Sequence, residues 1–474
     1  MTSALAALRN LASGLGLVVL AAAACGIAAG AAVSGDLMVL GCLACAAAVP
    51  FALVFIERAS AWDGRQAYRM IIILTIALSA VVRLRAIDDK SIDAQILVKL
   101  LAIGLTGLMA AAAFLRIGLQ RHSQAFFVWC AFLVYTMMTS FLTATPALSL
   151  VETTSNLAAF LLLYSAAHLL NRDNLVKAMV ASCFILCLLS LAAYGGMPSL
   201  GRMSDWVNGA FVPTWRLQGV FGTANAAGGA AALGIILTLL LSRGSRSRPL
   251  DLMMLGVFLV CLILSNNRMA MAGLAATLLY ASWASGNKAL KLAVFALTVG
   301  IVILIYLGTG DELLEFLSRS GSPDEITSGT GRSRIWAVVL ELWSEQPLLG
   351  YGAGSAKYIL PKNPLLFTAA AHAHNLFLNV LFSGGLVGLL LFGWGLVLAM
   401  RQAIGGKEHG IFALLIFFMV YGITEPTIGG LVSFVPMAFY TAVVLAIAPS
   451  RDRGADEARD GRYTQGASLK AASS

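Results

Sequence analysis

Residues 376–400 read LFLNVLFSGGLVGLLLFGWGLVLAM, a run of 25 residues without a charge. A stretch of about 20 apolar residues is long enough to cross a bilayer as a helix. Such runs recur from Leu11 to Ala448, and several are short, so they predict an all-α polytopic membrane protein with 12 to 14 transmembrane helices. The runs lie near 11–33, 36–56, 68–82, 96–115, 125–143, 147–169, 176–195, 219–241, 251–264, 269–283, 291–308, 376–400, 410–424 and 427–447.

The overall composition agrees with a membrane protein. Of the 474 residues, 59% are hydrophobic and 12% are charged, whereas a soluble domain carries about 25% charged residues. We expect residues 1–448 to form a single integral membrane domain. The polar residues 449–474 are expected to form a disordered cytoplasmic tail.

The distribution of basic residues predicts the orientation. With an even number of spans and both termini in the cytoplasm, inside segments hold 20 of the 32 basic residues and outside segments hold 11. Cytoplasmic loops are enriched in Lys and Arg, so this count favours cytoplasmic termini in a bacterial inner membrane. The net charge of +9 is then mostly a topological signal, and it gives no argument for a nucleic-acid partner.

This topology leaves two long loops outside, at 196–218 and about 309–375. The second is the large periplasmic loop, and its segment Ile335–Glu345 is expected to form a short amphipathic helix that lies at the bilayer surface. Long loops on a rigid scaffold often carry function, so a site on the non-cytoplasmic face is expected.

Four outside arginines are the residues that most need an explanation. They are Arg216, Arg268, Arg332 and Arg334. Arginine grips phosphate oxygens bidentately, so their convergence would make a phosphate or diphosphate site. The alternatives are a snorkelling anchor for Arg268, ordinary loop chemistry for Arg216, and contact with anionic lipid head groups for Arg332 and Arg334.

Two histidines lie where the large loop re-enters the membrane. His372 and His374 belong to the stretch Ala-His-Ala-His-Asn at 371–375. A neutral imidazole can accept a proton from a sugar hydroxyl. The alternatives are interfacial packing and a metal site, but no third ligand stands at a familiar spacing, so no metal is expected. Glu425 is the one acidic residue outside that we single out, although it could equally be a helix-end residue in water.

Five motifs follow one another from Arg216 to Gly388. They are Arg216…Gly219-Val-Phe-Gly222-Thr-Ala-Asn225, Ser265-Asn-Asn-Arg268, Gly331-Arg332…Trp336…Pro347-Leu-Leu-Gly350-Tyr-Gly352, His372-Ala-His374-Asn375 and Gly384-Gly-Leu-Val-Gly388. Taken in this order, they resemble the motifs of the bacterial O-antigen ligase and polysaccharide polymerase superfamily, and the resemblance extends over residues 216–425.

The resemblance implies a metal-independent, inverting glycosyltransferase that needs no cofactor. Its donor would be a glycan on undecaprenyl diphosphate, and its acceptor a lipid A core sugar or another lipid-linked glycan. Membrane lipids would be further partners. By motif, His374 would be the catalytic base, and Arg216, Arg268 and Arg332 would hold the diphosphate. His372 and Asn375 would have supporting roles, and Asn375 could orient a sugar or the His374 ring. Arg334 and Glu425, singled out above from the residues themselves, are further candidates for support.

Other functions stay open at this stage. Within the superfamily, the chain could be a ligase, which we favour slightly, or a repeat-unit polymerase. A transporter or flippase for a lipid-linked anion would also place arginines along a wet path, but it predicts charges at mid-membrane depth and often repeated halves. A non-catalytic assembly scaffold would tolerate the loss of His374.

Overall fold

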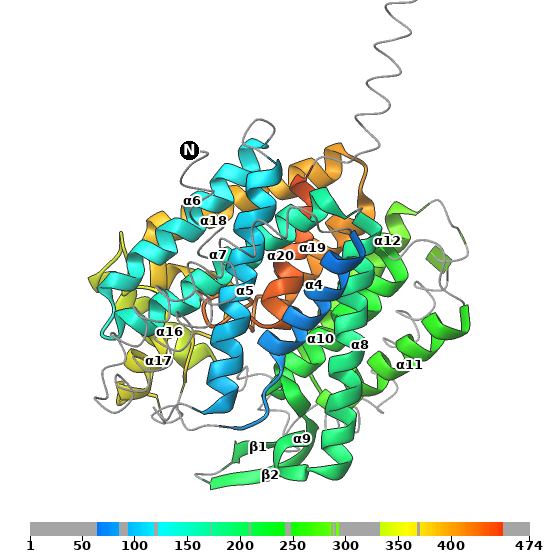
Figure 1. Cartoon of the computed structure of the whole chain (residues 1–474). Coiled ribbons are helices and arrows are strands. Elements are labelled where there is room, and N and C mark those ends of the chain that lie inside the picture. The colour runs from blue at the N-terminus through cyan, green and yellow to red at the C-terminus, as the bar shows by residue number, and fades with distance from the viewer. Residues whose placement is uncertain are drawn as a thin grey trace, which may run out of the picture.

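The computed structural model describes residues 64–84, 93–117, 122–170, 172–207, 210–241, 248–285, 288, 291–292, 332–366 and 370–448. Among these residues, six helices are long and apolar enough to cross a membrane, and four shorter apolar helices accompany them. The predicted all-α polytopic membrane protein is confirmed (Figure 1).

The order of the elements follows the apolar pattern of the sequence. The bundle helices are α4 (Gly64–Ser79), α5 (Ala94–Ile117), α6 (Gln124–Thr139), α7 (Pro146–Leu169), α8 (Arg172–Gly196), α10 (Ala224–Ile236) with its extension η3 (Leu237–Leu241), α11 (Arg248–Ser265), α12 (Arg268–Ala284), α18 (Leu376–Gly405), α19 (His409–Tyr421) and α20 (Phe434–Ile447). The connecting elements are η1 (Ser140–Leu142), α9 (Pro198–Gly201), η2 (Gly219–Phe221), α16 (Arg332–Glu345), α17 (Ala356–Ile359) and η6 (Leu360–Lys362).

Part of the prediction falls outside the described residues. This applies to the spans expected near 11–33 and 36–56, to residues 293–331 with most of the span expected near 291–308, and to the tail 449–474. The single integral membrane domain over residues 1–448 and the total number of spans therefore stay predictions.

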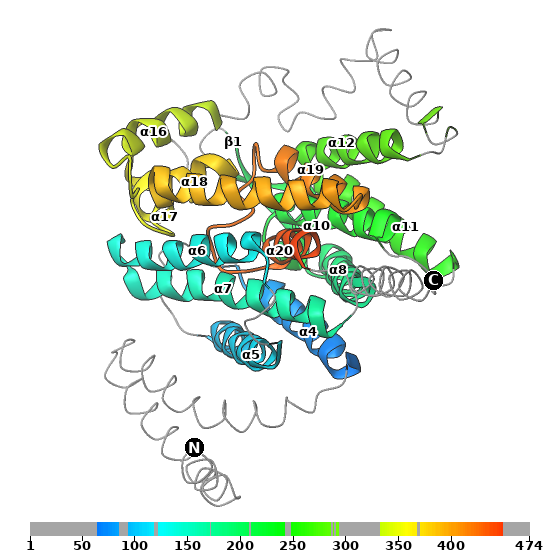
Figure 2. The ribbon, with the colours of Figure 1, turned by 90° about the horizontal axis from the view of Figure 1, so that it is seen from above.

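The most buried helix of the bundle is α20. Nearly every residue from Phe434 to Ile447 is buried, and α20 contacts α7, α8, α10, α18 and α19. Seen from above in Figure 2, α20 lies in the middle of the bundle. Aromatic rings fill the space beside it, with Phe439 packed edge-on against Trp129 at 5.7 Å between ring centroids. The helices around α20 therefore form one packed body.

The two ends of the bundle differ in their chemistry. At one end, the start of α8 meets the connection between α18 and α19, where Arg172 pairs with Glu408 at 2.9 Å. Arg401 and Lys407 lie close to the same end in the chain. Because successive helices alternate in direction, the starts of α10, α12 and α18 lie at the opposite end. That opposite end is called the outer end below.

A β-hairpin at the outer end was not predicted. Strands β1 (Arg202–Val207) and β2 (Ala210–Leu217) pair antiparallel within the loop that we had expected only to be long. In Figure 1 the hairpin lies beyond the ends of α8 and α10. It brings Arg216, near the end of β2, back towards the bundle.

Helix boundaries also differ from the prediction in the large loop and before α20. The amphipathic helix in the large loop is confirmed as α16, but it begins at Arg332 and not at Ile335. The span expected from residue 427 is wrong at its start, because α20 begins at Phe434 and the preceding segment from Gly422 to Ser433 is not helical. This segment carries Glu425.

The large loop is tied to the bundle at a break in α18. Gly385 has φ 60° and ψ −162°, which interrupts the helical hydrogen bonds. The turn after α16 replaces them, since the Tyr351 amide donates to the Phe382 carbonyl at 2.9 Å and the Leu386 amide donates to the Pro347 carbonyl at 2.8 Å. Irregular backbone beside a membrane helix needs such partners within the protein. The loop that carries α16 is therefore fixed against α18.

Candidate active site

Arg216 is the most deeply buried of the predicted arginines. Its side chain comes from β2 and the residue is only 2% exposed. The Nε atom donates to the Ser265 carbonyl at 3.1 Å, and Nη2 donates to the Asn225 side-chain oxygen at 3.1 Å. A buried charge is stable only when it is paired and hydrogen-bonded. These bonds join the hairpin to the end of α11 and the start of α10.

Glu425 connects this arginine to a second one. The Asn225 side-chain amide donates to Glu425 Oε1 at 2.6 Å, and Arg332 Nη2 donates to the same oxygen at 2.6 Å. Both side chains of the Arg332–Glu425 ion pair are largely buried. A chain of hydrogen bonds thus runs from Arg216 through Asn225 and Glu425 to Arg332, across 209 positions of sequence between Arg216 and Glu425.

Arg268 lies at the edge of this network. It is the first residue of α12, and the helix is capped by the preceding Asn267, whose Oδ1 accepts from the amides of the second and third helical residues. The Asn267 side-chain amide also donates to the Asn225 backbone carbonyl at 2.8 Å. The Tyr421 hydroxyl donates a second hydrogen bond to the same carbonyl at 2.9 Å. The start of α12, where helix dipoles favour anions, is therefore held against the start of α10.

The two predicted histidines lie side by side. The rings of His372 and His374 are 4.0 Å apart between centroids, and the His374 amide donates to His372 Nδ1 at 3.3 Å. Burial, helped by the positive charge of Arg332, lowers the pKa of His372 to about 4. His372 is therefore neutral near pH 7, and the Arg332 guanidinium lies close enough to influence it.

The backbone at His374 is unusual and is followed by a helix cap. His374 has φ 47°, in the left-handed region that non-glycine residues seldom adopt. Asn375 then caps α18, since its Oδ1 accepts a hydrogen bond from the Leu378 backbone amide at 2.9 Å. The side-chain amide of Asn375 donates to the Ile423 carbonyl, also at 2.9 Å. Both ends of the Asn375 side chain thus bond to backbone, and through Ile423 they join the histidines to the segment that carries Glu425.

The predicted residues therefore fall into three groups. Arg216, Arg332 and Glu425 share one hydrogen-bonded network, with Arg268 at its edge and the two histidines beside Arg332. The contacts of Asn375 described above are those of a cap. Arg334 is exposed on α16, and two residues along a helix place it about 200° around the helix axis from Arg332.

Asn225 and Asn267 were missed as site residues. Both stand inside the quoted motifs, but an asparagine there can equally be a simple cap or turn residue. A partly buried position that touches two charged groups, as Asn225 touches Arg216 and Glu425, depends on contacts across the fold. Neither residue type nor spacing could identify it.

Two comparisons with known proteins agree with the motifs. Residues 252–393 match a family model described as O-antigen ligase. The chain is also 30% identical over 220 residues to an O-antigen ligase of Pseudomonas aeruginosa, an alignment that covers 44% of this chain and 51% of the relative. The chain thus spans about half the length of the curated relative it matches. The predicted resemblance to the O-antigen ligase superfamily is confirmed.

Proposed function

We propose that this protein is a periplasmic-face glycosyltransferase of the O-antigen ligase type. It moves a glycan from undecaprenyl diphosphate to a sugar hydroxyl of the acceptor, in lipopolysaccharide or surface polysaccharide biosynthesis. The observation that supports this most is the convergence of Arg216, Arg332 and Glu425 at the outer end, with Arg268 and the histidines next to them.

The charges of the network suit a diphosphate. Arg216 and Arg332, together with Arg268 at the edge of the network, contribute three positive charges and Glu425 one negative charge, which leaves an excess of two. A diphosphate that links a lipid to a sugar carries two negative charges and gains another as the sugar departs. Fixed donors stabilise charge that develops in a transition state, so this site favours departure of the diphosphate.

The histidines supply the matching proton acceptor. His374 takes the proton of the acceptor hydroxyl while the hydroxyl oxygen bonds to the anomeric carbon. The bond from that carbon to the diphosphate oxygen breaks, and the diphosphate leaves with the electron pair. His372 is neutral near pH 7 and accepts a hydrogen bond from the His374 amide, so it helps to hold the backbone of His374 in place. No metal or cofactor enters these steps.

The distribution of charges supports the orientation. Arg172, Arg401 and Lys407 lie at the end opposite the arginine network, and basic residues prefer the cytoplasmic side. The network then faces the periplasm, and both termini of the chain lie in the cytoplasm.

Deletion of the gene tests the reaction and separates ligase from polymerase. In a ligase, the deletion should leave long glycan chains on undecaprenyl diphosphate and none on the final acceptor. In a polymerase of the same superfamily, single repeat units should accumulate instead. An unchanged lipid-linked pool would contradict both assignments.

Complementation of the deletion tests the base. The wild-type gene should restore transfer and His374→Ala should not, at equal protein levels in the membrane. The matched control is His409→Ala, at the opposite end of the bundle, where the ring contacts Tyr280. This control should behave as wild type.

A further inference from the structure

The segment from Gly422 to Ser433 is irregular backbone inside a helical bundle. It connects α19 to α20 and reaches Asn156 of α7, which lies ten residues after Pro146 and so about 15 Å along the helix from its outer end. Backbone groups at such depth must find partners within the protein, because lipid offers none. The partners of this segment therefore decide whether it has one position.

Polar side chains of two bundle helices supply these partners. Asn379 of α18 and the α18 cap residue Asn375 bond to residues 428 and 423 of the segment, and Ser155 and Asn156 of α7 bond to residues 432 and 430. The bonds run from Asn375 to the Ile423 carbonyl at 2.9 Å, from Asn379 to the Ile428 carbonyl at 3.2 Å, from Asn156 to the Gly430 carbonyl at 2.8 Å, and from the Val432 amide to Ser155 Oγ at 3.1 Å.

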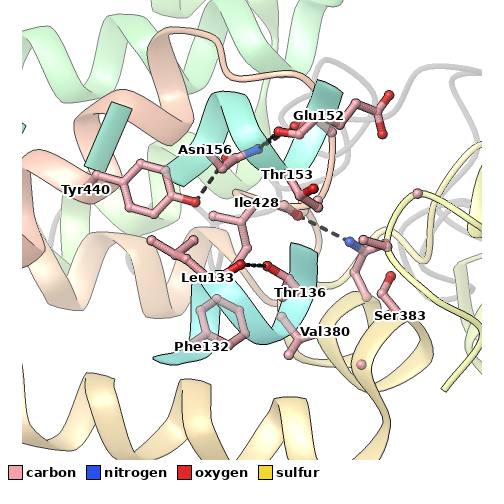
Figure 3. A pocket seen from close by; sticks show the side chains of 16 residues that line it. Phe132, Leu133, Thr136, Glu152, Thr153, Asn156, Val380, Ser383, Ile428 and Tyr440 are labelled. Carbon is pink, nitrogen blue, oxygen red and sulfur yellow. Dashed lines mark hydrogen bonds between the residues drawn. The ribbon is translucent and has the colours of Figure 1, made fainter. Parts of the chain in front are cut away.

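The two deeper asparagines are themselves buried. Asn156 is 6% exposed and Asn379 is 4% exposed. Asn156 also accepts a hydrogen bond from the Tyr440 hydroxyl at 2.9 Å, which is drawn in Figure 3. At Gly429, with φ 115°, an added Cβ would overlap the Asn379 amide. Polar groups inside a membrane bundle are unfavourable unless bonded and tend to mark function.

A cavity beside these asparagines does not explain them. Its volume is about 50 Å³, between α6, α7, α18 and the irregular segment (Figure 3). That is room for a small number of water molecules and not for a sugar ring. The amides of Asn156 and Asn379 bond to the backbone of the segment, so their role concerns the segment.

The attachment points enclose Glu425. One bond fixes Ile423, two residues before Glu425, and another fixes Ile428, three residues after it. Glu425 in turn accepts hydrogen bonds from Asn225 and Arg332. A shift of the segment would move the carboxylate and, with it, the guanidinium of Arg332.

We propose that Asn379 and Asn156 are positioning residues for donor binding. They fix the segment from Gly422 to Ser433, and through Glu425 they set the spacing of the arginines that hold the diphosphate. This inference rests on the proposed function. It predicts that loss of either amide weakens binding of the donor and leaves binding of the acceptor unchanged.

The test measures both KM values in purified protein that transfers glycan from its undecaprenyl diphosphate donor. Asn379→Leu and Asn156→Leu should each raise the KM for donor roughly fivefold to tenfold, the effect of one lost hydrogen bond. The KM for acceptor should change by less than about twofold. Thr441→Val is the matched control, because it removes a buried α20 hydroxyl whose bond within the described part of the chain is to its own helix, at the Met437 carbonyl. It should change neither value.

A double variant separates positioning from general loss of structure. In a Glu425→Gln background, Asn379→Leu should change the KM for donor by less than about twofold, because the carboxylate that it positions is gone. If Asn379→Leu does not fold, Asn379→Ser takes its place in the same comparison.

The outcomes distinguish this inference from the function on which it rests. If wild-type protein transfers glycan but the asparagine variants keep the wild-type KM for donor, or raise both KM values equally, the positioning role is wrong. If the effect of Asn379→Leu is undiminished in the Glu425→Gln background, the role is also wrong. If wild-type protein neither binds the donor nor transfers glycan, the proposed function fails, and this inference fails with it.

Discussion

Replacing Glu425 with glutamine should destabilise the protein through the ion pair with Arg332. The change keeps the size of the side chain and removes its charge. In the wild-type protein one oxygen of Glu425 accepts from both Arg332 and Asn225 at 2.6 Å. The amide oxygen of the variant side chain would be a weaker acceptor for both donors, and the Arg332 guanidinium would lose the negative charge of Glu425.

The burial of the pair sets the size of the effect. The side chains of Arg332 and Glu425 are 13% and 9% exposed. Removing one partner of a buried ion pair costs about 3–5 kcal/mol, and we expect the lower end, about 3 kcal/mol, because the amide oxygen still accepts one bond. Glu408→Gln is the matched control, since the Arg172–Glu408 pair is 21% and 34% exposed. It should cost about 1 kcal/mol or less.

The assay is reversible unfolding in mixed detergent and lipid micelles, titrated with SDS and followed by tryptophan fluorescence. The double variant Glu425→Gln with Arg332→Gln completes a thermodynamic cycle. The two single changes should add to more than the double change by about 1.5 kcal/mol or more. The reasoning is refuted if the single effects add within about 0.5 kcal/mol, or if Glu408→Gln costs as much as Glu425→Gln.

Three further results follow from the same contacts. Gly385→Ala should lower stability by at least about 1–3 kcal/mol, because the residue has a positive φ and an added Cβ would overlap the Leu348 carbonyl. The control is Gly393→Ala, whose added Cβ would meet no atom within 4 Å outside its own stretch of helix. It should be neutral in the same SDS titration. The pKa of His372 is lowered from 6.5 to about 4, so between these pH values the unfolded chain binds more protons than the folded one, and stability should fall as pH drops through that range. In His372→Gln this part of the fall should vanish. A pH dependence identical to wild type would contradict the lowered pKa of His372. Asn267→Ala should cost about 1–2 kcal/mol, as the loss of a helix cap does, and a stability equal to wild type would show that the cap and the bond to Asn225 contribute nothing.

The bundle itself was largely predictable from the sequence. Apolar length and the positions of basic residues identify helices such as α7 and α8 with little help from packing, because a bilayer demands about 20 apolar residues in each span. The start of α20 was missed for the same reason. Residues 427–433 are apolar enough to continue the span, and the hydrogen bonds that Asn379 of α18 and Ser155 and Asn156 of α7 make to them support an irregular course there.

The hairpin had a signal that was not used. Asn208-Gly209 separates two short segments that contain Trp206 and Phe211, and Asn-Gly between such segments is typical of a two-residue hairpin turn. The apolar runs on both sides of this stretch give a stronger signal, for membrane spans. Arg216 would otherwise have been expected at the end of a strand.

The composition of the candidate site could be predicted only in part. The outside arginines and the two histidines were found because the positive-inside rule and the chemistry of phosphate single them out. Their convergence depends on contacts such as that of Asn225 with Glu425, 200 positions apart. Contacts of that separation follow from the packing of α10 against α19 and α20, which a single sequence does not specify.

Binding of undecaprenyl diphosphate by the purified protein tests the central claim most directly. Wild-type protein should bind this lipid at least about tenfold more tightly than undecaprenyl monophosphate, since charge-assisted bonds to phosphate are each worth about 1.5–3 kcal/mol. Arg268→Ala should remove this preference, and Arg401→Ala, at the other end of α18, should keep it. Equal affinity of wild-type protein for the two lipids, or a preference that survives Arg268→Ala, would contradict a diphosphate site at the outer end of the bundle.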